Sequence, residues 1–163
     1  MERRLMGEEL ELGLSVTGSK AGIDHPSSYL LEHLQDSGIK FVVINRILDD
    51  FDEIFCTEPE RTYYWLEYGA KLYTYTGDHP EYATPECQSA YDVVVHDKAA
   101  EVILRNLVLL LRDKIKAILI KNNVCYAQGV YEATDVLNGE TSWGLHENYL
   151  VSSDISPFIF REV

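Results

Sequence analysis

Carboxylate side chains at two places in the chain have the chemistry of a magnesium site. Glu9 and Glu11 stand two residues apart in a stretch that alternates charged and apolar side chains, so in a strand they would point the same way. Glu81 follows a second, β-rich segment and a turn signal at Gly77 and Asp78. Magnesium prefers a few carboxylates and completes its shell with water and phosphate oxygens, as in ATP sites. The alternative for each glutamate is an ordinary solvated face.

Other polar residues gather at expected strand ends and turns. Tyr73 and His79 flank the turn before Glu81, residues 121–123 read Lys-Asn-Asn, and residues 146–148 read His-Glu-Asn. None of these groups is a strong motif alone. The Walker-type glycine loop, G-x-x-x-x-G-K-[ST], does not occur, so a bound nucleotide would be held in another way.

The elements that must position these residues follow from periodicity. Helical spacing of apolar residues predicts a long helix from about 88 to 113, which would be the main brace of the core. A shorter helix should end before Gly38 and begin with Asp24 or Ser27 as its cap. Further predicted features are strands at 3–16, 70–76, 149–151 and, buried, at 117–120, a turn stiffened by Pro80, and a loop at 124–142. This order predicts one α+β domain over residues 1–163, with an antiparallel sheet packed by helices.

Composition narrows the class of protein. Acidic residues outnumber basic ones 27 to 14, which gives a formal charge of −13 and argues against a nucleic-acid partner. The charge also suits an acidic inhibitor, although a cation site explains it better. The three cysteines lack metal or disulfide spacing, which favours free thiols in a reducing cytoplasm. We expect no membrane association, because the start lacks a signal peptide and apolar runs are shorter than the roughly 20 residues that span a bilayer.

Several segments together resemble one family. Residues 6–11 (MGEELE) are similar to the Met-Gly-Ile-Glu-Thr-Glu opening of the ligase and depupylase of the prokaryotic ubiquitin-like protein, Pup. Residues 69–87 match that family's Arg-Leu-Tyr and His-Pro-Glu-Tyr block closely. Residues 92–99, 121–123 and 144–150 resemble its next helix, its Lys-Asn-Asn segment and its Gly-x-His-Glu-Asn-Tyr-Leu signature, in the family's order. The chain is thus identified as similar to the amino-terminal portion of a glutamine synthetase-like carboxylate–amine ligase.

The resemblance implies a fold, cofactors and site residues. In the family, ATP phosphorylates a glutamate carboxylate on a small protein modifier, and a lysine amine then displaces the phosphate to give an isopeptide bond. The implied cofactors are therefore ATP and magnesium. Carried over by position, the metal-site residues are Glu9, Tyr73 and Glu81, with Glu11 and His146 as further ligands, and the nucleotide-facing residues are Lys71 and Thr84.

This chain departs from the family pattern at the expected catalytic position. Tyr75 stands where the family has an aspartate that accepts the proton of the incoming amine, and a phenol with an ordinary pKa near 10 is a poor base at neutral pH. Asp78 is the candidate substitute. The spacing from Tyr73 to Glu81 equals that of the ligase branch. Lys71 replaces an arginine, which keeps the charge but loses bidentate recognition of phosphate.

The length differs as well, because family members continue for some hundreds of residues beyond the position of Val163. We therefore expect an incomplete half of the family fold, completed by a second polypeptide or by a homo-oligomer, and acting on a carboxylate substrate or small protein modifier. The alternative is a catalytically degenerate scaffold or regulatory subunit of a ligase-like complex.

Overall fold

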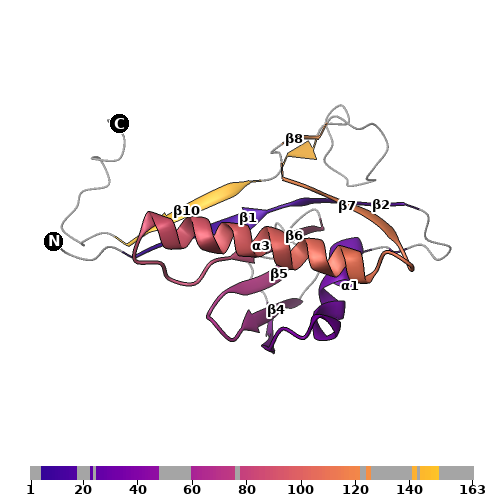
Figure 1. Cartoon of the computed structure of the whole chain (residues 1–163), viewed down its shortest axis with the longest axis horizontal. Coiled ribbons are helices and arrows are strands. Elements are labelled where there is room, and N and C mark those ends of the chain that lie inside the picture. The colour runs from indigo at the N-terminus through magenta and orange to yellow at the C-terminus, as the bar shows by residue number, and fades with distance from the viewer. Residues whose placement is uncertain are drawn as a thin grey trace.

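A computed structural model of the chain describes residues 5–17, 23, 25–47, 60–75, 78–121, 124–125, 141–142 and 144–150 (Figure 1). The helical elements are α1 (Pro26–Glu32), the 3₁₀ helix η1 (His33–Ser37) and α3 (Ala90–Leu110). The strands are β1 (Met6–Glu11), β2 (Gly13–Thr17), β3 (Phe41–Ile47), β4 (Glu60–Leu66), β5 (Lys71–Tyr75), β6 (His79–Ala83), β7 (Lys116–Ile120), β8 (Val124–Cys125), β9 (Thr141–Ser142) and β10 (Leu145–Tyr149).

Six strands form the main sheet in the order β10-β1-β6-β5-β4-β3, and every neighbouring pair is antiparallel. Strands β2 and β7 form a second antiparallel pair, and β8 and β9 a third. The predicted α+β class with an antiparallel sheet is therefore confirmed. The long helix predicted at about 88 to 113 is also confirmed, as α3.

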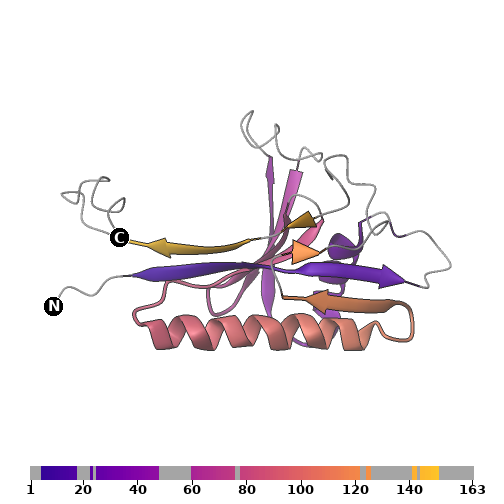
Figure 2. The same ribbon diagram turned by 90° about the horizontal axis from the view of Figure 1, so that it is seen from above.

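Helix α3 runs along one side of β1 and β2, whereas β10 lies on the far side of β1 from it (Figures 1 and 2). Ser89 is the N-cap of this helix, and its hydroxyl accepts a hydrogen bond from the Asp92 backbone N–H at 3.2 Å. Such a cap satisfies one of the free N–H groups of the first turn. Its inner face carries Ala100, Leu104 and Leu107, which are fully buried.

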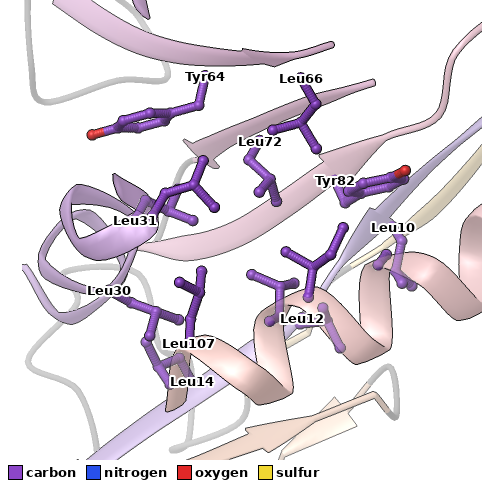
Figure 3. Close-up of a cluster of buried hydrophobic side chains, with 14 of the residues drawn as sticks. Leu10, Leu12, Leu14, Leu30, Leu31, Tyr64, Leu66, Leu72, Tyr82 and Leu107 are labelled. Carbon is purple, nitrogen blue, oxygen red and sulfur yellow. The ribbon is translucent and has the colours of Figure 1, made fainter. Parts of the chain in front are cut away.

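The core lies between α1, α3 and one face of the strands (Figure 3). Leu10, Leu12 and Leu14 alternate along β1 and β2, so their side chains all point toward the helices. Across the sheet, Leu10 stands opposite Tyr82, and Tyr82 opposite Leu72. Burial of each such side chain contributes about 1.5–3 kcal/mol, so this face anchors the strands that carry the polar residues.

Some local expectations were wrong. The residue before the first turn of α1 is His25 and Pro26 opens the helix, while the Ser27 N–H is bound by the carboxylate of Asp78 at 3.1 Å. Pro80 lies within β6 and not in the turn. Strand β7 is only half buried because, among the described strands, it pairs with β2 alone.

Other expectations were only partly right. The predicted loop at 124–142 begins and ends with strands β8 and β9, and its residues 126–140 lie outside the described part. The last strand lies at Leu145–Tyr149, a few residues before its predicted place. In the part of the chain that the structure describes, no helix has the length and apolar character needed to cross a membrane.

Candidate functional site

The strand register brings the predicted metal-site residues to one face of the main sheet. Glu9 stands opposite His146 on β10, and Glu11 opposite Glu81 on β6, which in turn stands opposite Tyr73 on β5. Directly opposite residues of antiparallel strands share a face and lie about 5 Å apart at Cβ. We call these residues, together with Lys71 and His79, the polar face. It is the face opposite to the one that α1 and α3 cover.

Tyr73 and Glu81 form the buried centre of the polar face. The Tyr73 hydroxyl donates a hydrogen bond to Glu81 Oε1, and the Tyr73 ring lies 5.0 Å from the ring of Tyr63 on β4. Burial and then the negative charge of Glu81 raise the pKa of Tyr73, so this phenol stays neutral and acts as a donor. As it stands, the pair is a carboxylate with one oxygen held by a neutral hydroxyl.

Glu81 is a buried carboxyl group with two further acidic side chains, Glu9 and Glu11, on the same face. Burial, and after it the charges of Glu9 and Glu11, raise its pKa from an ordinary 4.5 to about 7, although the Tyr73 hydroxyl and His146 act in the opposite direction. A divalent cation between these oxygens would relieve both the burial cost and the repulsion. As the side chains stand, no group of three or more His, Cys, Asp or Glu residues within the described ranges is close enough to hold a metal ion.

Glu11 is a buried carboxylate with both oxygens engaged. His79 Nδ1 lies 2.7 Å from Oε1, and the backbone N–H of Gly144 donates to Oε2 at 2.6 Å. Because an ionised carboxylate only accepts, the ring nitrogen of His79 is the donor. Glu9 is more open, with its Oε2 at 3.5 Å from Nδ1 of His146.

Lys71 lies on the polar face beside the carboxylates. It stands opposite Ala83, which stands opposite Glu9. Its Nζ lies 5.1 Å from the ring centroid of Trp65, a half-exposed side chain on β4. A cation over an indole face is held loosely at an exposed site, by about 0.5–1 kcal/mol, and so can turn toward a phosphate group.

The remaining predicted residues lie in different surroundings. The Thr84 hydroxyl accepts a hydrogen bond from the Glu8 backbone N–H at 3.0 Å, beyond the end of β6. Tyr75 stands opposite His79 and so shares the polar face, but at the exposed end of β5.

Asp78 has a left-handed backbone, with φ of 60°, and its carboxylate lies at the first turn of α1. Burial raises its pKa to about 6, and the hydrogen bond from Ser27 opposes this shift. The structure therefore brings Glu9, Glu11, Tyr73, Glu81 and His146 together, whereas Asp78 and Thr84 have separate partners.

Sequence reasoning missed three contributors to this site. His79 was noted beside Glu81 but given no role, although its position two residues before Glu81 in a strand places both on one face. Tyr63 was missed because β4 was not predicted, despite the β-prone run from 62 to 66. Gly144 was noted only as part of a motif, and no local signal marks its contact with Glu11.

The family model for the Pup-ligase protein matches residues 4–159 of this chain. The chain therefore belongs to the Pup-ligase family. Two relatives, both Pup–protein ligases, are similar over 93% of this chain: that of a Nocardioides species at 32% identity and that of Gordonia bronchialis at 30%. A third, from Acidimicrobium ferrooxidans, is 43% identical over 53% of the chain.

A solved structure shows the same fold. It is the crystal structure of the complex between the prokaryotic ubiquitin-like protein Pup and its ligase PafA, with a TM-score of 0.58, 24% identity and 97% of this chain covered. This likeness confirms the expected glutamine synthetase-like fold. The chain spans 18–28% of the length of these three relatives and 27% of the matched structure.

Proposed function

We propose that this chain holds ATP and magnesium in a carboxylate–amine ligase. In the reaction, the γ-phosphoryl group of ATP passes to a carboxylate to give an acyl phosphate and ADP. An amine then attacks the carbonyl carbon, loses a proton, and expels phosphate to leave an amide or isopeptide bond. Membership of the Pup-ligase family makes Pup the first candidate for the carboxylate donor, with a second polypeptide or a second copy completing the active site.

The observation that carries the proposal is the shared polar face. Glu81 and Glu9, with Tyr73 and His146 beside them, would bind the cations, and Glu11 keeps one lone pair on each oxygen with which it could also bind one. Lys71 lies on β5, the strand paired with β6, and would contact the phosphate oxygens. Thr84, just beyond the end of β6, would face the nucleotide. Cations bridging the phosphates would neutralise the charge that develops during phosphoryl transfer.

Calorimetric titration of the chain with magnesium and ATP tests this proposal. We expect binding that Glu81→Gln weakens at least tenfold, because the variant removes one negative charge from the centre of the site. Glu67→Gln is the matched control, since Glu67 is an exposed partner of Lys40 in the turn that follows β4. No heat with the unmodified chain, or equal loss in both variants, would count against the proposal.

A second candidate function, a binding or regulatory subunit without chemistry, is favoured by one residue. Tyr75 occupies the position of the family's aspartate, and no carboxylate stands there to accept the amine proton. Tyr75→Asp tests this alternative in an assay for amide formation with Pup, ATP and a protein amine. A gain of product would show a site that is otherwise intact, whereas magnesium–ATP binding without product would favour the subunit.

A further inference from the structure

Glu11, His79 and Gly144 form a buried contact that joins three parts of the chain; we call it the clasp. Glu11 lies at the end of β1, His79 opens β6, and Gly144 directly precedes β10. Glu11 and His79 are both more than nine-tenths buried. In the part of the chain that the structure describes, each carboxylate oxygen of Glu11 contacts one partner: His79 Nδ1 at 2.7 Å and the Gly144 N–H at 2.6 Å.

Gly144 is held to Glu11 twice. Besides donating to the carboxylate, its carbonyl accepts the Glu11 backbone N–H at 3.2 Å. A Cβ at this position would lie 3.0 Å from Nε2 of His146 and 3.5 Å from Glu11 Oε2. The His146 ring is therefore packed against the bare backbone of Gly144, and its other nitrogen lies 3.5 Å from Glu9.

Among the described residues, strand β10 has few other contacts that attach it to the sheet. All of its residues are exposed, and among the described strands it pairs only with β1. Burial of apolar surface thus contributes little to its attachment, so the ladder to β1 and the clasp carry most of it. A bond to a buried charge is stronger than a bond between neutral groups, which makes the clasp a large part of that attachment.

We propose that His79 is a positioning residue. It orients the Glu11 carboxylate so that Glu11 holds Gly144, and Gly144 in turn places His146 beside Glu9 on the polar face. Hydrogen-bonded partners that orient a ligand set in this way govern metal affinity. The effect on cation binding rests on the proposed function, whereas the effect on β10 does not.

Two substitutions of His79 separate the effect of where its hydrogen-bond donor lies from the effect of its side-chain size. Asn carries an amide N–H close to the place of Nδ1, whereas Gln carries it near the place of Nε2 and cannot reach Glu11 in the same geometry. Amide hydrogen exchange is measured over residues 144–150 in the metal-free chain. We expect His79→Gln to exchange about tenfold faster there than the unmodified chain, the factor that loss of one charge-assisted hydrogen bond implies, and His79→Asn to stay within about twofold.

Helix α3 supplies the internal control for this measurement. Its amides at 100–107 report global unfolding, so unchanged exchange there shows that the variants remain folded. Equal exchange at 144–150 in the Gln and Asn variants would overturn the proposal. So would faster exchange in both segments of the Gln variant, because His79 would then act on general stability.

Titration with magnesium alone then tests the link to the site. His79→Gln should weaken magnesium binding about tenfold and His79→Asn about twofold or less. Gly144→Ala should also weaken it, because the new methyl group displaces the His146 ring while the contact between His79 and Glu11 stays. An unmodified chain that binds no magnesium would refute the proposed function and leave the exchange result to decide the clasp. Faster exchange at 144–150 in the Gln variant with unchanged magnesium affinity would refute the link.

Discussion

The two faces of the main sheet are built from alternate residues of the same strands, yet they are buried by different means. On β6, Tyr82 points toward the helices and packs among leucines, whereas His79 and Glu81 of the same strand point to the polar face and are buried as charged or polar groups. The first face gains free energy from burial, and the second loses it unless partners or ions compensate. The helix-covered face therefore holds the fold together, and this allows the polar face to keep carboxyl groups buried close to one another.

The largest expected effect is on the helix-covered face. Leu72→Ala removes a fully buried side chain between Tyr82 and Tyr64, and should lower the free energy of unfolding by about 2–5 kcal/mol. Urea denaturation measures it. Val42→Ala, at a position 65% exposed, is the control and should change stability by less than about 0.5 kcal/mol. Similar values for both would remove the contrast between the faces.

The second prediction concerns pH. Glu81 has a folded pKa of about 7 against an ordinary 4.5, so the folded chain binds more protons than the unfolded chain between these values. Stability is therefore greatest below pH 4.5 as far as this group is concerned, and is lost as pH rises toward 7, by at most on the order of 3 kcal/mol. Asp78 acts in the same direction between 3.8 and about 6.

Thermal unfolding at a series of pH values in a chelating buffer measures how stability changes with pH. Glu81→Gln should reduce the loss of stability between pH 5 and 7 and leave only the part due to Asp78. A slope that is unchanged in this variant would show that Glu81 is not the group concerned.

A smaller effect is expected from the hydroxyl at the centre of the polar face. Tyr73→Phe removes the donor to Glu81 and should cost about 1–2 kcal/mol at neutral pH. The substitution should also raise the pKa of Glu81 further, because the hydrogen bond from Tyr73 stabilises the ionised carboxylate and would be absent. NMR titration of the Glu81 carboxyl carbon measures the shift. Tyr91→Phe, on the exposed face of α3, is the matched control and should do neither.

The smallest expected effect lies outside both faces, at Lys121. Its ammonium donates to Asp97 at 2.6 Å and to Glu101 at 2.6 Å, linking the end of β7 to α3. Because the group is partly exposed, Lys121→Met should cost less than about 1 kcal/mol, and added salt should reduce the difference. Denaturation at low and high salt measures the loss of stability. The control is Lys40→Met, which removes the exposed ion pair with Glu67. A cost above 2 kcal/mol would place Lys121 among the core contacts.

Short-range patterns in the sequence predicted several elements of this structure. The alternation around Glu9 and Glu11, and the helical spacing from Tyr91 onward, were sufficient to predict one strand and one long helix. Period 2 alone placed Glu9 and Glu11 on one face. The resemblance then named Tyr73, Glu81 and His146, which the strand register brings to that same face.

Long-range pairing could not be read in the same way. That His146 stands opposite Glu9, or that Gly144 binds Glu11, depends on which strands become neighbours, and residues so far apart in the chain carry no local trace of it. The cap of α1 was missed for the same reason, because its acceptor, Asp78, comes from a turn 51 positions later. The half-exposed state of β7 likewise depends on its place at an edge and not on its apolar residues.

The pairing of β1 with β10 has a consequence for how the molecule assembles. Strands β4, β5 and β6 follow one another in the sequence, so closing the short connections between them costs little entropy and they can pair early. Residues 6–10 of β1 can pair with β10 only after residues 145–149 have been synthesised. During synthesis on the ribosome, β1 can pair with β6 first and acquires its other neighbour only when nearly the whole of this stretch has emerged. His146, which stands opposite Glu9, therefore joins the sheet after β1 and β6 have paired.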